Sequence, residues 1–210
     1  MKRHTLRSAV LTLALVAPGT VACAAQAVTA SAAQADSLRN HYTAADVAFL
    51  NAMIGHHAQA VLIAGWVPTH GTSRPVQLMS ERIVVGQQDE IRLMQQWLRD
   101  QRLPVPDPMG HQHAMPGMDH GVMMPGMLSA AQLAQLDSAR GPAFDRLFLT
   151  FMILHHQGAV TMVDQLFATP GAAQVETVFR LASDVYADQT TEIDRMQQLL
   201  AALPSPRTDP

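Results

Sequence analysis

The sequence is poor in the residues on which many exported and catalytic proteins depend. Of its 210 residues only one, Cys23, is a cysteine, and it lies close to the N-terminus. The rest of the chain therefore has no disulfide or thiolate site, and any soft-metal chemistry must use methionine and histidine. The net charge is −3 and there is no basic tract, which argues against nucleic acid as a partner.

Aromatic residues make up only 5% of the chain, and no stretch of useful length alternates apolar and polar residues as a half-buried strand does. The apolar content is nevertheless 48%, with an excess of Ala, Leu, Val and Met. This composition is typical of helical bundles. The sequence therefore predicts an all-α protein.

The N-terminus has the pattern of an export signal. Three basic residues precede an apolar stretch over residues 9–17, which is too short to be a permanent transmembrane helix. We expect residues 1–32 to hold a signal peptide and a short tail, and the protein to be periplasmic or extracellular. Lipidation of Cys23 is an alternative, and this anchor would then be the protein's link to a membrane.

An internal repeat is the clearest feature of the chain. The segment from Met53 to Val61 matches the segment from Met152 to Val160, and each contains a His-His pair. A second match lies downstream, where Gln and Glu recur at the same spacing before a Met-Gln-Gln run. Two helices followed by two similar helices predict a four-helix bundle made of two repeated helical hairpins.

Helix signals divide the chain into parts. Thr43 with Asp46, and Ser129 with Gln132, have the spacing of capping boxes. Thr169-Pro170 is expected to start the fourth long helix. The predicted bundle covers 43–203, with a first hairpin over 43–102, a Met/His-rich loop over 103–128 and a second hairpin over 129–203.

Polar residues interrupt the apolar stripes of all four predicted helices. His57 and His156 fall on the core-facing stripes of the first and third helices, and the histidine before each lies about 100° away. The second and fourth helices carry a Gln and a Glu on theirs: Gln87, Glu90, Gln189 and Glu192. A buried carboxylate needs a partner, and the histidines are the expected ones.

Two interpretations of this layer stay open. In one, Glu-to-His and Gln-to-His hydrogen bonds only fix the helix register. In the other, the layer binds metal, and the Glu and Gln side chains orient the imidazoles from behind. The candidate ligands in the helices are then His56, His57, His155, His156, Met53, Met152 and Met162.

The predicted loop supplies a second group of soft ligands within a Gly- and Pro-rich stretch that has no core to fill. The candidates are His111, His113, Met115, Met118, His120, Met123, Met124 and Met127. Thioether sulfur favours Cu(I), and imidazole suits both Cu(I) and Cu(II). Copper is therefore the expected metal, with zinc and iron less favoured because their sites use more thiolates or carboxylates.

These motifs resemble a known family. The His-His segments, the Phe-Asp-Arg-Leu-Phe-Leu block from Phe144 to Leu149 and the Glu-Ile-x-x-Met-Gln-Gln blocks resemble the domain-of-unknown-function 305 family of exported bacterial proteins, which includes CopM-like copper-binding proteins. The resemblance runs from about Thr43 to Leu203. It implies a ferritin-like antiparallel four-helix bundle made of two repeated helical hairpins and a role in periplasmic copper binding or resistance. One departure is Gly55, where the family often has Pro.

The leading hypothesis is an exported protein that captures, buffers or chaperones copper and exchanges it with another copper protein. One alternative is a ferritin-like metalloenzyme, such as an oxidase, with a His/Glu site. Another is a structural or interaction module without metal. The sequence leaves the oligomeric state open and shows no motif that requires catalysis.

Overall fold

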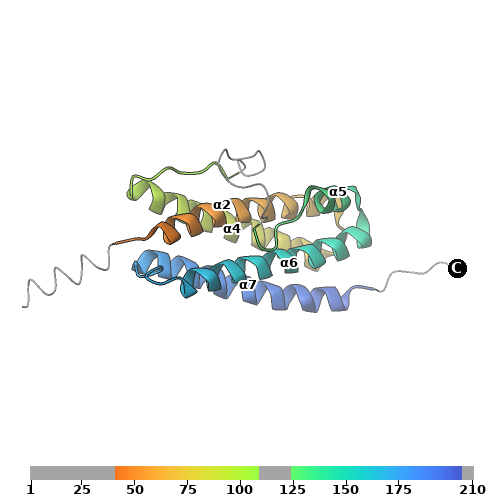
Figure 1. The fold of residues 1–210 in the computed structure, drawn as a ribbon. Helices are drawn as coiled ribbons and strands as arrows, with labels where there is room; N and C mark the ends of the chain where they lie inside the picture. The colour runs from red at the N-terminus through yellow and green to blue at the C-terminus, as the bar shows by residue number, and fades with distance from the viewer. Residues whose placement is uncertain (1–40, 109–123, 205–210) are drawn as a thin grey trace, which may run out of the picture. The chain divides into compact units, whose positions relative to one another are not determined.

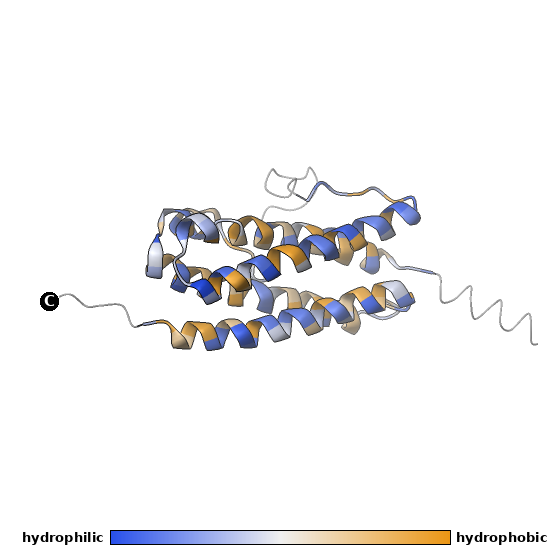
Figure 2. Cartoon of the chain, turned by 180° about the vertical axis from the view of Figure 1, so that it is seen from behind, coloured by the Kyte–Doolittle hydropathy of each residue, from blue (hydrophilic) through white to orange (hydrophobic). Residues whose placement is uncertain are grey.

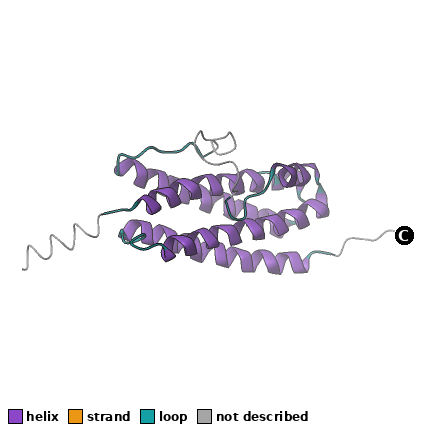
Figure 3. Ribbon diagram, in the orientation of Figure 1, coloured by secondary structure: helices purple, strands orange, loops and turns teal. Residues whose placement is uncertain are grey.

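The computed structural model describes residues 41–108 and 124–204 (Figure 1). The expected all-α class is confirmed, since these residues contain helices and no strand (Figure 3). The helices are α2 (Ala44–Ala64), α3 (Val67–His70), α4 (Arg74–Asp100), α5 (Ala130–Ser138), α6 (Gly141–Ala168) and α7 (Glu176–Ala202).

The long helices pack in pairs. Helix α2 lies against α4 and helix α6 against α7, while α2 and α6 also pack on each other. The contact between α4 and α7 is less extensive. Along each long helix, hydrophobic and hydrophilic residues alternate at short intervals, as expected for helices that bury one side (Figure 2).

A polar layer divides the hydrophobic core into two clusters. One cluster includes Leu50 of α2 and Leu98 of α4, and the other includes Ile83 of α4 and Phe148 of α6. On α4, α6 and α7 the buried His, Gln and Glu residues fall between the positions that supply the two clusters. The apolar stripe of the helices is thus interrupted at one common level.

Two buried aspartates tie the helix pairs together. Asp46 at the start of α2 accepts a hydrogen bond from the backbone N–H of Ala173, between α6 and α7, at 2.6 Å. Asp145 of α6 accepts from the backbone N–H groups of Thr72 and Ser73, just before α4, at 3.2 and 2.9 Å. Each aspartate therefore satisfies backbone donors in the connection of the other helix pair.

The expected helix starts are mostly found. Thr43 with Asp46, and Ser129 with Gln132, form the predicted capping boxes. The predicted start of the last long helix at Thr169-Pro170 is wrong, because α7 begins at Glu176. The intervening turn contains a residue with positive φ, Ala173 at +54°, whose N–H is held by Asp46. This tertiary contact overrides the local helix-start signal.

Helix α2 is long and apolar enough, with the short helix after it, to cross a membrane by length and composition alone. Its apolar window is however mostly buried. The cause is the packing of α2 against both α4 and α6. The apolar character of this segment is thus explained by its position in the core.

Replacing Asp46 tests the tie between the helix pairs. We expect Asp46→Ala to lower the free energy of unfolding by about 2–3 kcal/mol, because a buried carboxylate that accepts backbone hydrogen bonds is lost. Thr43→Ala, which removes only the capping hydroxyl, should cost about 1 kcal/mol. Urea denaturation measures both, and equal losses would contradict a contribution from the Ala173 contact.

Candidate metal centre

Four buried imidazoles from α2 and α6 form the centre of the polar layer. His56, His57, His155 and His156 are all 0% exposed. The rings of His56 and His155 face each other across the two helices, with centroids 3.9 Å apart and planes at 40°. His57 and His156 lie beside them on their own helices, at centroid distances of 6.4 and 6.3 Å.

Each outer imidazole meets a carboxylate from the neighbouring helix. His57 Nε2 lies 2.7 Å from Glu90 Oε2 of α4. His156 Nε2 lies 2.9 Å from Glu192 Oε2 of α7. The expected pairing of the two buried glutamates with histidines is therefore present in both halves of the chain. It gives each carboxylate the partner that its burial requires.

These contacts determine which ring nitrogen is available. A carboxylate oxygen only accepts, so the Nε2–H groups of His57 and His156 donate to their glutamates. His56 Nε2–H donates in the same way to the backbone carbonyl of Pro125, at 2.9 Å. In the neutral tautomer the Nδ1 atoms of these three residues carry the lone pair, and none has a hydrogen-bond partner in the described structure.

Burial favours the uncharged form of His56, His155 and His156. It lowers the pKa of His56 from 6.5 to about 3, helped by the nearby His57 and opposed by the hydrogen bond to Pro125. Burial and the facing His56 lower the pKa of His155 well below its ordinary value. Burial also lowers the pKa of His156, although the hydrogen bond to Glu192 opposes the shift. Neutral imidazole is the form that binds metal ions.

The prediction that the Gln side chains donate hydrogen bonds to the histidines, or accept them, is wrong. The side-chain amides of Gln87 and Gln189 are buried, and neither their oxygen nor their nitrogen has a partner among the described residues. Both ring nitrogens of His155 and the Oε1 atom of Glu90 are also buried without a hydrogen-bond partner among these residues. Buried polar groups in native proteins are nearly always paired, so the layer has unused capacity for ligands.

The methionines predicted as ligands lie next to this layer. Met53 and Met152 are fully buried and precede the His-His pairs by one helical turn. Met53 and Met162 belong to one apolar cluster and Met152 to the other. Within residues 41–108 and 124–204, no three His, Cys, Asp or Glu side chains are arranged to hold one ion. A metal site here therefore needs thioether ligands or a rearrangement of the imidazoles.

The end of the Met/His-rich segment closes the layer. Residues 124–128, here called the strap, run between α2 and α6 (Figure 1). The strap is held by the bond from His56 to Pro125 and by Gln59, whose side chain exchanges two hydrogen bonds with the Leu128 backbone at 2.8 and 3.1 Å. The backbone of the strap thus lies directly over a buried imidazole.

Two glycines allow this close approach. Gly126 has φ of +76°, in the left-handed region that favours glycine. A Cβ atom on Gly158 of α6 would lie 2.0 Å from the Pro125 carbonyl oxygen. The strap can therefore reach His56 only because α6 has no side chain at this position.

The loop ligands are only partly within the described structure. Met124 and Met127 belong to the strap and are half-buried. The other predicted ligands of the segment lie outside the described residues and stay predictions: His111, His113, Met115, Met118, His120 and Met123.

Sequence reasoning missed Gln59, Gly126 and Gly158, which build the strap contact. The repeat contained a signal for it, because Gln59 and Gly158 stand at matching positions of the two His-His segments. A glycine inside a long helix costs about 1 kcal/mol relative to alanine and calls for a packing reason. The difference between these two positions marks where the two halves of the chain are not equivalent.

Comparison with known proteins places this arrangement in a family. The family described as "Domain of unknown function (DUF305)" matches residues 21–200. The chain belongs to the DUF305 family. None of the curated proteins matches the sequence significantly.

Solved structures similar to this DUF305 protein have the same fold. A DUF305 fragment from Deinococcus radiodurans is 32% identical, with a TM-score of 0.63 over 77% of this chain and 99% of its own. A DUF305 protein from Streptomyces coelicolor, described as secreted, is 29% identical, with a TM-score of 0.63 over 75% of this chain and 92% of its own.

CopM in its Cu(II)-bound form is a third similar structure, at 29% identity and a TM-score of 0.58 over 74% of this chain and 95% of its own. CopM has also been solved in Cu(I)-bound, silver-bound and apo forms. Metal-bound relatives are thus among the proteins that this chain resembles.

The buried imidazoles predict a pH-dependent stability. Because the pKa of His56 is lower in the folded than in the unfolded protein, the unfolded state binds more protons below pH 6.5. The contribution of neutral His56 to the free energy of unfolding is fully present above pH 6.5, and it is lost as the pH falls toward 3. In metal-free protein, His56→Gln should flatten this decline by about 1.4 kcal/mol per pH unit. Urea denaturation at several pH values measures the slope, and an unchanged slope would contradict a neutral His56.

Substitution of Gly158 tests the strap. Alanine favours the helix by about 1 kcal/mol, yet we expect Gly158→Ala to destabilise the protein by about 2 kcal/mol because its Cβ would displace Pro125. Gly86→Ala is the matched control, since Gly86 lies in α4 with no atom near the position of the added Cβ. Thermal denaturation should show a higher melting temperature for Gly86→Ala and a lower one for Gly158→Ala. A higher melting temperature for both variants would show that the strap does not depend on Gly158.

Proposed function

We propose that this protein is an exported copper-binding protein that captures, buffers or hands on copper in copper homeostasis or resistance. The observation that supports this most is the arrangement of the buried imidazoles. Oxygen acceptors hold Nε2 of three of them, while all four Nδ1 atoms are buried without a hydrogen-bond partner among the described residues. Fixing one ring nitrogen with an acceptor is how proteins orient a histidine ligand.

The proposed site centres on His56 of α2 and His155 of α6, whose ring centroids lie 3.9 Å apart. His57 and His156, with the thioethers of Met53 and Met152, are the further candidates nearby along the same helices. Met162, Met124 and Met127, with the ligands predicted over residues 111–123, would supply sulfur and imidazole for capture. A set of imidazoles and thioethers favours copper over zinc or iron.

The glutamates and glutamines have a supporting role in this proposal. Glu90 and Glu192 accept from Nε2 of His57 and His156, which raises the basicity of the opposite ring nitrogen. The side-chain amides of Gln87 and Gln189 would form a hydrogen bond in this layer only when a bound ligand or a side-chain shift supplies a partner. An oxidase site built on the two glutamates is less well supported, because each carboxylate is already bonded to an imidazole.

The similarity to CopM supports the choice of metal, since CopM is known with both Cu(I) and Cu(II) bound. For the fold, we propose a ferritin-like antiparallel four-helix bundle made of two repeated helical hairpins. The pairing of α2 with α4 and of α6 with α7 supports it. We further propose export through the signal predicted over residues 1–32, with lipidation of Cys23 as an alternative. The similarity to a protein described as secreted supports export.

Copper titration tests the proposed function. Metal-free protein should compete with a chromophoric chelator for Cu(I), and copper should raise its melting temperature because a ligand that binds only the native state stabilises it. The His56→Phe/His155→Phe variant should bind fewer copper ions. Its rings keep the aromatic volume but have no lone pair.

Two controls make the result specific. His70→Phe changes a histidine outside the layer, near Trp66 and Asp137, and should leave the copper stoichiometry unchanged. A variant with residues 109–123 scrambled separates binding in the loop from binding in the helices. Equal stoichiometry in the double variant and the His70 control would exclude the imidazole site. The whole proposal is excluded if the unchanged protein binds copper no better than a variant in which both the layer and the loop are changed.

A further inference from the structure

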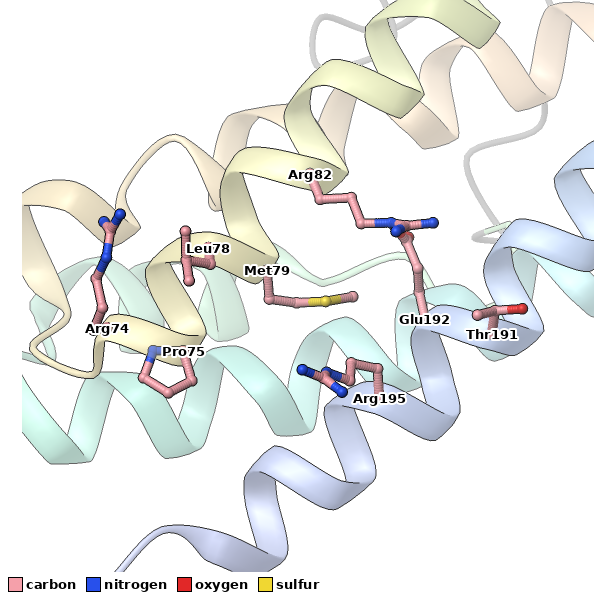
Figure 4. Close-up of a pocket in the computed structure, with 8 residues that line it drawn as sticks. All are labelled: Arg74, Pro75, Leu78, Met79, Arg82, Thr191, Glu192 and Arg195. Carbon is pink, nitrogen blue, oxygen red and sulfur yellow. The ribbon is translucent and has the colours of Figure 1, made fainter.

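A cavity lies beside the histidine layer, on the outer side of the helices, and shares Glu192 with that layer. It has a volume of about 500 Å³ and opens between the first half of α4 and the second half of α7 (Figure 4). The residues used below are Arg74, Leu78, Met79 and Arg82 of α4 and Glu192 and Arg195 of α7. The volume falls in the range of cavities that bind small organic ligands.

Arginine dominates the lining of this cavity. Three of the eight lining residues are arginines, and Glu192 is the one carboxylate among them. The carboxylate is already engaged, with Oε2 on His156 Nε2 at 2.9 Å and Oε1 on Arg82 Nε at 3.6 Å. The cavity therefore presents a net positive charge within a chain whose net charge is −3.

The arginines are not a consequence of the sequence repeat. At the positions of α7 that match Arg74 and Arg82 of α4, the chain has Glu176 and Asp184. The position of α4 that matches Arg195 is Leu93. The basic character is thus specific to this side of the α4–α7 contact, whereas the glutamates that bind histidine are common to both.

The guanidinium groups keep donors available for a ligand. Arg195 has no ion-pair partner among the residues that the structure describes, and its side chain extends toward α4 (Figure 4). Arg74 reaches Glu81 only at 3.6 Å, and both of these side chains are exposed. At such distances the pairs are weak, and a planar guanidinium can turn to bind an oxyanion with two parallel hydrogen bonds.

The cavity also offers apolar surface beside the charge. Leu78 is 50% exposed and supplies this surface, while Met79, which lies between Arg82 and Arg195 in Figure 4, is 6% exposed and forms the floor. A free inorganic anion would use only the guanidinium groups. A ligand with both an oxyanion and a small apolar body would cover Leu78 as well.

We propose that this cavity binds a small organic phosphate ester through Arg82 and Arg195, with its apolar part on Leu78. Arg74 contributes to the positive potential at the outer end. The arginines of the cavity have no role in the proposed copper site, and the ligand binds without copper. Its ligand would sit next to Glu192 and hence one contact away from His156.

Calorimetric titration of metal-free protein with phenyl phosphate tests the proposal, and inorganic phosphate serves as the comparison. We expect one molecule of phenyl phosphate to bind per chain, about tenfold more tightly than inorganic phosphate, because it adds the apolar contact. Binding should weaken as the salt concentration rises, since the guanidinium groups are exposed. Absence of saturable binding of both anions would overturn the proposal.

Arginine variants make the site specific. The Arg82→Gln/Arg195→Gln variant should lose affinity for phenyl phosphate at least about tenfold. The control variant Arg99→Gln/Arg180→Gln removes the same charge from exposed positions of α4 and α7 that do not line the cavity, and it should bind as the unchanged protein does.

Leu78→Gln is the test of the apolar contact, since Leu78 is the exposed apolar side chain of the cavity. It should reduce the advantage of phenyl phosphate over inorganic phosphate while inorganic phosphate binding is preserved. An equal loss of affinity in the cavity variant and the control variant would show a general charge effect and overturn the site. Thermal denaturation confirms that each variant is folded. Because the titrations contain no metal, their failure would leave the copper proposal untouched.

Discussion

The burial of four imidazoles and two carboxylates at one level of the helices constrains the rest of this protein. Glu90 and Glu192 are tolerated in the core because each accepts a hydrogen bond from a fully buried histidine. This pairing separates two apolar clusters and requires α4 and α7 to present their glutamates at the height of the His-His pairs. The helix register and the orientation of the imidazoles are therefore set by the same contacts.

The two halves of the chain resemble each other in this layer but differ around it. On one side Gln59 holds the strap, and at the matching position Gly158 makes room for it. On the outer surface, arginines line a cavity beside Glu192, where the matching positions near Glu90 are acidic or apolar. A nearly symmetric set of potential ligands is thus placed between unlike surroundings.

Much of the helical framework could be predicted from the sequence because the signals are local. The capping boxes at Thr43 and Ser129 depend on residues three positions apart, and the apolar periodicity identifies the long helices. The start of α7 could not be predicted in this way, since Ala173 takes its conformation from a hydrogen bond to Asp46, far away in the chain. The pairing of each buried glutamate with a histidine followed from the cost of burying an unpaired charge.

The sequence alone determined which chemical groups meet in the core: the repeat and its spacing place two His-His pairs and two Glu side chains on apolar helix faces. Only the tertiary structure decided how they meet. It turned Nε2 of His57 and His156 toward the glutamates, left Gln87 and Gln189 without the expected histidine contacts, and laid the Pro125 carbonyl on His56. The physical reason is the distance along the chain over which each kind of interaction acts. Periodicity fixes the face of a helix on which a residue lies, whereas ring orientation and hydrogen-bond partners depend on which backbone and side chains other segments bring within about 3 Å.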